Sequence, residues 1–342
     1  MEIASPRVQG PAAAPPARRP GSVRRTSTIL MTWPDGILSG VRLTGRGRDL
    51  HTLPDGTAQV LRQDEIVAHA SPDRTIQWVT SNPSVPGLSR LAGARAGGRL
   101  RGALDEAVPG LRTEGAPMYL LLDDLAGASL IAGFIWSRWH DRLPDLSQPR
   151  SVLAPRTMQG ICSGFQPGAS SLNPDGTMSG IPQHNTEVPP LADPTDPLGW
   201  HELDSPPEMA MRRARRIDVY PHDGRLVLDA MFRDSCWEPG GREIAVHEYQ
   251  LHATTNPAGS ELASVLAVAR VLPYDECPLA APNVERLVGA PLAGLRSEVL
   301  VRLPGILGCT HLNDALRALA EVPILAAAMV GVSPRAHQGH GG

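Results

Sequence analysis

Residues 212–234 read RRARRIDVYPHDGRLVLDAMFRD, and apolar side chains alternate with polar ones on both sides of the pair Asp223-Gly224. Alternation with a period of two is typical of a half-buried strand, and Asp-Gly between two such runs indicates a tight hairpin. Residues 243–255 and 264–272 predict further strands, and residues 312–319 have the apolar spacing of a helix. Strands followed by helices predict an α+β fold built on an antiparallel sheet.

A similar pattern occurs earlier in the chain. Arg24-Arg25 followed by Asp35-Gly36 matches Arg212-Arg213 followed by Asp223-Gly224. Further matches follow in the same order: Arg48-Asp49 with Arg233-Asp234, Asn82-Pro83 with Asn256-Pro257, and Leu122-Asp123-Asp124 with Leu312-Asn313-Asp314. Ordered matches of this kind indicate a tandem duplication. We expect copy one at residues 24–134 and copy two at residues 212–330, packed against each other as a pseudo-dimer.

The remaining segments differ from the two copies in composition. Residues 1–23 are rich in Pro, Ala and Arg without apolar periodicity, which predicts a disordered lead-in, and residues 331–342 predict a disordered tail. Residues 135–211 carry many prolines and predict a connecting arm without regular structure. Trp200 gives this arm an aromatic anchor, so we expect the arm to wrap around the two copies.

The composition excludes several functions. The chain of 342 residues contains no lysine, so all 32 of its basic side chains are arginine, which rules out a lysine Schiff base or a phosphate-binding P-loop lysine. A net charge of -3 gives no electrostatic reason to bind nucleic acid. No apolar run is long enough to span a bilayer, and the amino terminus lacks the pattern of a secretory signal. We therefore expect a cytoplasmic protein that binds neither nucleic acid nor membrane.

The stretch Gly308 to Asp314 is the densest in reactive side chains. Cys309 and His311 stand where the matched stretch of copy one has Tyr119 and Leu121, so they belong to one copy only. Thr310 is a suitable N-cap, and a thiol just before a helix start should have a lowered pKa. Cys309 and His311 are therefore predicted to be catalytic; alternatively, both serve only the core.

His247 is the third predicted catalytic residue, as a general base. The segment from His247 to His252 resembles the H-E-x-x-H zinc motif without matching it, because the second histidine comes one residue late and the strand period sends the two histidines to opposite faces. The Glu65 to His69 spacing equals that of Glu243 to His247, which favours a structural role for His247 instead.

A metal site is the alternative for the same region. Cys277, Cys309 and His311, with His247 as a further donor, would form a sulfur and nitrogen set suited to zinc if the fold brings them together. Five further side chains are expected to bind a ligand around the site: Thr310, Asn313, Arg233, Glu248 and Trp200.

Several motifs resemble those of the bacterial family named domain of unknown function 2889. These are Cys309 to Asp314, Val246 to Tyr249, Phe232 to Ser235, and Leu121 to Leu125. The likeness covers most of residues 24–330 and implies a bacterial, actinobacterial, cytoplasmic protein, but it implies no reaction. From the residues, the first hypothesis is a cofactor-independent enzyme of hydrolase, lyase or isomerase type acting on a small organic or acyl substrate. The alternatives are a non-catalytic ligand-binding or assembly protein, and a protein with a structural zinc site.

Overall fold

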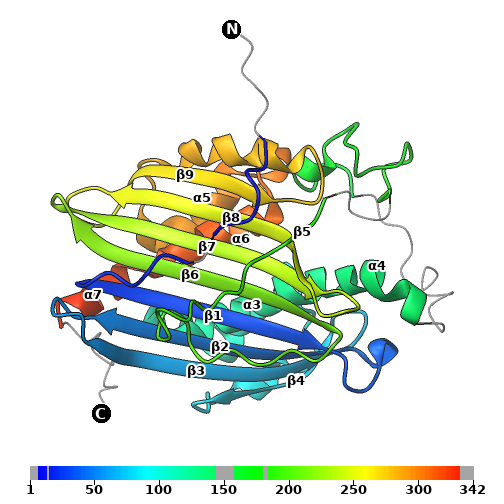
Figure 1. The fold of residues 1–342 in the computed structure, drawn as a ribbon, viewed down its shortest axis with the longest axis horizontal. Helices are drawn as coiled ribbons and strands as arrows, with labels where there is room; N and C mark the ends of the chain where they lie inside the picture. The colour runs from blue at the N-terminus through cyan, green and yellow to red at the C-terminus, as the bar shows by residue number, and fades with distance from the viewer. Residues whose placement is uncertain (1–6, 14, 144–157, 180–183, 332–342) are drawn as a thin grey trace, which may run out of the picture.

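A computed structural model describes residues 7–13, 15–143, 158–179 and 184–331. Its centre is one antiparallel sheet with the strand order β4-β3-β2-β1-β6-β7-β8, in which β8 also pairs with β9 and with the short β5 (Figure 1). The strands are β1 (Ser22–Thr32), β2 (Val41–Thr52), β3 (Ala58–Ala70), β4 (Ile76–Asn82), β5 (Thr186–Glu187), β6 (Ala210–His222), β7 (Arg225–Trp237), β8 (Glu243–Thr255) and β9 (Leu262–Val271).

The hairpin predicted at Asp223-Gly224 is confirmed, because β6 and β7 pair from Met211↔Cys236 to His222↔Arg225. The predicted strand at residues 243–255 is β8, and the strand predicted at residues 264–272 is β9 with both ends shifted by one or two residues. In the middle of the sheet, β1 pairs with β6 in antiparallel fashion. The β1/β6 pairing therefore joins two runs of four consecutive strands, β1–β4 and β6–β9.

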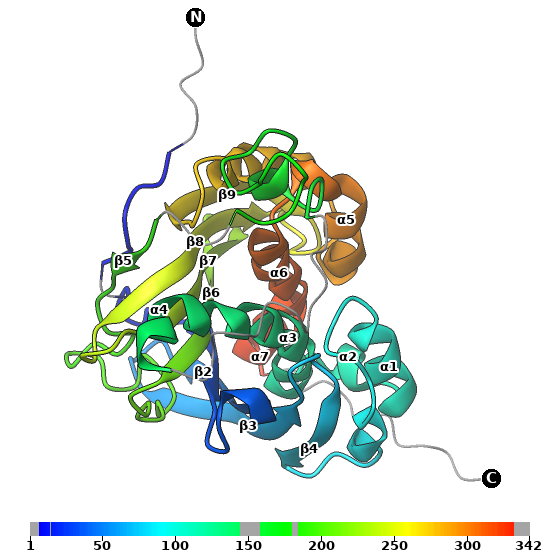
Figure 2. The same ribbon diagram turned by 90° about the vertical axis from the view of Figure 1, so that its right-hand side faces the viewer.

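The helices cover one face of the sheet, as Figure 2 shows from the side. The α-helices are α1 (Leu100–Ala107), α2 (Leu111–Glu114), α3 (Pro117–Ile131), α4 (Trp136–Trp139), α5 (Leu295–Arg302), α6 (Thr310–Ala318) and α7 (Val322–Met329). The 3-10 helices are η1 (Ile37–Ser39), η2 (Leu88–Leu91), η3 (Ala132–Ile135), η4 (His140–Arg142), η7 (Ser163–Phe165), η8 (Cys277–Leu287), η9 (Leu292–Gly294), η10 (Gly305–Leu307) and η11 (Leu319–Glu321). Mixed helix and antiparallel sheet confirm the α+β prediction.

The apolar core lies between the sheet and these helices, in two large clusters, one for each half of the sheet. Within the described residues, one helical stretch, Pro117–Arg142, is long and apolar enough to cross a bilayer, and 78% of its most apolar window is buried inside the protein. A helix that is apolar on all sides and buried to this extent is typical of the centre of a packed core.

The opposite face, called here the outer face, is crossed by two extended segments (Figure 1). Residues 7–13 and 15–21 lie along it, with the Ala12 N–H donating to Glu248 and Arg18 bonded to Asp196. These residues are therefore structured, which corrects the expected disordered lead-in; residues 1–6 and 332–342 lie outside the described residues. The second segment, from residue 184 to 209, buries Trp200 to 3% exposure beside Leu191 and Met231.

Candidate functional site

Two buried arginine–aspartate pairs mark equivalent places in the two halves of the sheet. Arg25 faces Asp49 across β1 and β2, and its guanidinium donates to both carboxylate oxygens at 2.6 Å. Arg213 faces Asp234 across β6 and β7 in the same way, at 2.8 and 3.0 Å. Directly opposite positions of an antiparallel pair share one face, here the helix-covered face, so both pairs form within the core.

The next strand differs between the halves. Asp234 faces His247 of β8, whereas Asp49 faces Arg62 of β3, and both ladders shift register immediately after this pair. His69 stands far along β3, opposite Arg42. The match of Glu65–His69 to Glu243–His247 is therefore wrong as a structural equivalence, and it gives no reason to assign His247 to the fold alone.

His311 reaches the same place from helix α6. This helix begins at Thr310, so Cys309 and not Thr310 occupies the N-cap position. The His311 ring stacks on the His247 ring with centroids 3.5 Å apart and planes inclined by 17°. His247 Nδ1 and His311 Nε2 lie 3.7 and 3.8 Å from Asp234 Oδ2, and one ligand atom from each of the three residues lies within 4.8 Å of the others. We call Asp234, His247 and His311 the triad.

His247 Nδ1 and His311 Nε2, the two nitrogens that face Asp234, have no hydrogen-bond partner among the described residues. Water has little access to them, because His247 is only 6% exposed and the His311 side chain only 14%. Burial, together with the neighbouring His311, places the pKa of His247 well below its ordinary value. Burial and the cations Arg213 and Arg215 lower the pKa of His311 to about 3. Both imidazoles are therefore neutral at pH 7, and a neutral imidazole is the form that binds a metal ion.

Charged side chains surround the triad on the helix side. Arg215 donates to both oxygens of Asp124 on α3, at 2.7 and 2.5 Å, and Arg213 reaches Asp314 on α6 at 3.3 Å. Burial raises the pKa of Asp314 more than Arg213 and Arg215 lower it. Asp314 and Asp124 thus serve to hold helices α6 and α3 to the sheet.

Cys309 lies on the far side of His311, with its Sγ 4.0 Å from His311 Nδ1. The sulfur is buried, and this burial raises the pKa of Cys309 despite the neighbouring Tyr249 hydroxyl and helix N–H groups. The expectation of a lowered pKa at the helix start is therefore wrong, because the loss of hydration outweighs the helix dipole.

The predicted metal set of Cys277, Cys309 and His311 differs from the one the fold assembles. Within the described ranges, the cluster with metal-ligand spacing is Asp234, His247 and His311. Sequence reasoning missed Asp234 because the Arg48-Asp49 pair of the first half made it look purely structural. The feature that identifies Asp234 is the strand register, because Asp234 of β7 lies directly opposite His247 of β8.

Three of the predicted binding residues lie on the outer face, away from the triad. Arg233 donates to Glu248 at 2.8 Å and to the Pro189 carbonyl, and Glu248 accepts from Ala12, so this pair fastens the two outer segments. Trp200 belongs to the second of those segments and packs beside Leu191, Ala214 and Met231. Arg233 and Glu248 point away from the triad because neighbours along a strand point to opposite faces.

The other two predicted binding residues, Thr310 and Asn313, belong to α6. The Asn313 side chain donates to the Leu303 carbonyl at 3.3 Å, which closes the turn before the helix. The Thr310 N–H lowers the pKa of Cys162 slightly, against the larger effect of burial. Both residues therefore belong to the helix start, and among the described residues no hydrogen bond or ion pair joins either side chain to the triad.

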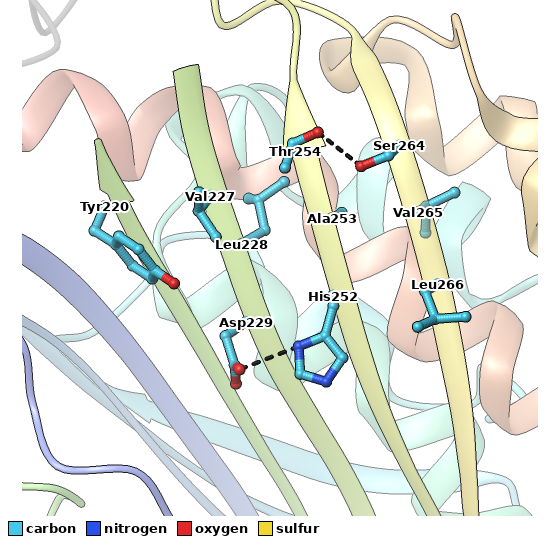
Figure 3. Close-up of a pocket in the computed structure, with 10 residues that line it drawn as sticks. All are labelled: Tyr220, Val227, Leu228, Asp229, His252, Ala253, Thr254, Ser264, Val265 and Leu266. Atoms are coloured by element: carbon cyan, nitrogen blue, oxygen red, sulfur yellow. Dashed lines mark hydrogen bonds and ion pairs between the residues drawn. The ribbon is translucent and has the colours of Figure 1, made fainter. Parts of the chain in front are cut away.

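A separate hollow of about 260 Å³ lies on the outer face over β6 to β9 (Figure 3). His252 Nδ1 lies 3.3 Å from Asp229 Oδ2, and Thr254 and Ser264 are hydrogen-bonded at 2.7 Å. Burial opposes ionisation of Asp229, yet His252 and Arg216 lower its pKa to about 2. No predicted site residue lines this hollow, and the prediction that His247 and His252 face opposite sides is confirmed.

The fold and the site define an α+β protein with one long antiparallel sheet and a buried histidine–histidine–aspartate cluster beneath helix α6. Residues 211–325 match the model of the family described as protein of unknown function (DUF2889). This range runs from β6 into α7 and contains all three residues of the triad, and it confirms the family resemblance for the second half of the chain. Among curated proteins and among solved structures, nothing matches the chain.

Proposed function

We propose that this chain binds one divalent transition-metal ion through Asp234, His247 and His311, and that the ion is the centre at which the chain acts on a small molecule. One observation carries the proposal: two buried, neutral imidazole nitrogens without partners face the same carboxylate oxygen at 3.7 and 3.8 Å. A buried polar nitrogen without a partner is costly, and these separations are too long for hydrogen bonds. A cation between the three atoms removes that cost.

The ligand types fit this assignment. Two imidazoles and one carboxylate form a common protein ligand set for zinc at catalytic sites and for non-haem iron. Three protein ligands leave coordination positions for water or a substrate oxygen, which supports Lewis-acid or hydrolytic chemistry on a small organic or acyl compound. Arg213 holds the carboxylate of Asp234 in place, the role that outer partners of metal ligands usually have.

The two halves of the chain provide an internal comparison in favour of a functional triad. We propose that they arose by tandem duplication and pack as a pseudo-dimer, supported by the matching strand order and by register shifts at Asp49/Leu50 and Asp234/Ser235. The first half keeps the arginine–aspartate pair but has Arg62 opposite Asp49. The fold therefore needs the pair and does not need the histidines.

A second candidate function uses the same residues without a metal. The two nitrogens of His311 face Cys309 Sγ at 4.0 Å and Asp234 Oδ2 at 3.8 Å, which is the order nucleophile, base and orienting carboxylate of cysteine enzymes. This arrangement supports the cofactor-independent acyl-type enzyme expected from the sequence. It is the weaker candidate, because Cys309 is 3% exposed and its burial raises the pKa of the thiol.

The test is a count of bound metal. The chain is dialysed against Co²⁺, and its metal content is measured for the wild type and for His247→Ala, His311→Ala and Asp234→Asn. We expect each variant to hold one ion fewer than the wild type. His201→Ala is the matched control, because His201 is equally buried but its two nitrogens are bonded to Thr26 and Thr28. Equal metal content in all variants would refute the metal centre.

The control for the second candidate is Cys309→Ala. The metal proposal predicts that this variant keeps its Co²⁺, since the sulfur faces the nitrogen of His311 that points away from the triad. Activity on an acyl substrate that disappears in Cys309→Ala but survives removal of metal would establish the cysteine mechanism instead. A cytoplasmic location and a small-molecule ligand remain part of the proposal.

A further inference from the structure

Arg215 of β6 keeps one guanidinium nitrogen free beside the triad. The side chain is only 3% exposed, and its Nε and Nη2 atoms donate to the two oxygens of Asp124. The third nitrogen, Nη1, is buried and has no hydrogen-bond partner among the described residues. A buried N–H group without an acceptor is costly, so Nη1 is a donor available to an oxygen atom of a ligand.

Phe232 connects Arg215 to the triad. It lies directly opposite Arg215 on β7, two residues before Asp234 and therefore on the same face of the sheet. The Arg215 guanidinium lies 4.7 Å from the centre of the Phe232 ring, and the centre of the His311 ring lies 6.3 Å from it. The free nitrogen and a ligand of the proposed metal are thus neighbours of one aromatic ring.

The first half of the sheet has neither side chain. Counted from the equivalent arginine–aspartate pairs, Arg215 corresponds to Ser27 and Phe232 corresponds to Gly47, and these two residues also pair directly across their strands. Ser27 and Gly47 are buried beneath the helices without a charged group. The fold therefore does not require a cation at this position, and the cation occurs only where the histidines occur.

The ion pairs that extend outward from the triad are balanced in charge. Within the part of the chain that the structure describes, the arginines joined in this way are Arg25, Arg101, Arg213, Arg215, Arg296 and Arg317. The carboxylates are Asp49, Asp123, Asp124, Asp234, Asp314 and Glu321. A divalent ion at the triad adds two positive charges to this largely buried network. Two negative charges on a ligand would offset them.

Solvent reaches the network along helix α6. The side chains of His311 and Asp314, three residues apart on one face of this helix, are each 14% exposed, whereas Asp234 behind them is fully buried. A small ligand can therefore approach the triad along this face of α6.

We propose that the substrate class of the triad is a small organic acid with two carboxylates, one bound to the metal ion and the other to Nη1 of Arg215. This assignment, which rests on the metal centre proposed above, makes Arg215 a substrate-binding residue. Asp124 occupies the other two nitrogens and holds the guanidinium in place, so one oxygen of a carboxylate fits the donor that remains. Holding the substrate at two points fixes its orientation at the metal.

The test uses the chain loaded with Co²⁺ and follows its visible absorption spectrum. The probes are malonate, succinate and glutarate, each compared with the acid of equal chain length that has one carboxylate: propionate, butyrate and valerate. Every probe offers the metal one carboxylate, and only the diacids offer a second one to Arg215. In the wild type we expect at least one diacid to bind about tenfold more tightly than its partner, or better.

Arg215→Met is expected to remove this preference and to keep one Co²⁺ per chain, because Arg215 is not a metal ligand. Arg296→Met is the matched control, since Arg296 is also buried and also bonded to two carboxylate side chains, Asp123 and Glu321, and it should keep the preference.

The wild type alone can overturn the assignment, whether or not Arg215→Met folds. Equal binding of all diacids and their partners by the Co²⁺-loaded wild type would refute the role of Arg215 and leave the metal centre standing. A preference that persists in Arg215→Met, or that is lost equally in Arg296→Met, would do the same. A wild type that takes up no Co²⁺ would instead refute the metal centre, and the substrate class with it.

Discussion

Replacing His311 with leucine should make the protein less sensitive to acid. Leucine is the residue that the first half carries at the matched position, Leu121, so the change is one that a similar environment already tolerates. In the folded chain the pKa of His311 is about 3, whereas an unfolded histidine titrates near 6.5. Below pH 6.5 this histidine therefore binds a proton in the unfolded chain but stays neutral in the folded chain.

The size of the effect follows from this difference. Each proton taken up only by the unfolded chain lowers the free energy of unfolding by about 1.4 kcal/mol per pH unit. The contribution of His311 is complete above pH 6.5, is lost progressively as the pH falls, and stops changing near pH 3. Between pH 6.5 and pH 5 the wild type should lose about 2 kcal/mol through this one side chain.

The assay is guanidinium unfolding at pH 7 and pH 5, with a chelator present so that metal binding does not add its own pH dependence. The stability lost between the two pH values should be about 2 kcal/mol smaller in His311→Leu than in the wild type. Leu121→Met is the control, because it alters packing at the matched position without removing a titratable group. An equal loss in His311→Leu and the wild type would refute the neutral, buried assignment of His311.

Three further predictions concern the packing around the site. Glu248→Gln breaks the buried pair with Arg233, so the free energy of unfolding should fall by about 3–5 kcal/mol, and an unchanged denaturation midpoint would argue against this. Trp200→Ala should cost about 3–5 kcal/mol in the same assay if the 184–209 segment is packed as described, whereas a mobile segment would lose almost nothing. Gly164→Ala places a methyl group against Cys277 Sγ and should lower stability by about 1–3 kcal/mol; thermal unfolding at the wild-type temperature would contradict the close contact.

The sequence predicted the fold well wherever a periodic pattern was strong. The hairpin at Asp223-Gly224 and strand β8 follow from alternation, and helix α6 follows from apolar spacing. The amino-terminal outer segment was not predictable in this way, because it is held by single contacts such as Ala12 to Glu248 and not by a repeating pattern. The second outer segment belongs to the arm for which Trp200 was the expected anchor.

The candidate site was predicted only in part. His311 was identified because one half of the chain has it and the other does not, whereas His247 was predicted as a general base although the match to Glu65–His69 favoured a structural role. Asp234 was missed because a matched aspartate, Asp49, exists in the first half, and the register that places Asp234 beside His247 is a property of the folded sheet. The alternation of β8 separated His247 from Glu248 but did not show which of them faces the helices.

X-ray absorption of Co²⁺ bound to the Cys309→Ala variant tests the metal centre most directly, because this variant removes the thiol that faces His311. The triad predicts one ion per chain, surrounded by nitrogen and oxygen at about 2.0–2.2 Å with the outer-shell pattern of imidazole. Adding His247→Ala should abolish this signal. An ion without imidazole ligands, or a folded Cys309→Ala variant that binds no Co²⁺, would contradict the assignment of Asp234, His247 and His311 as a metal site.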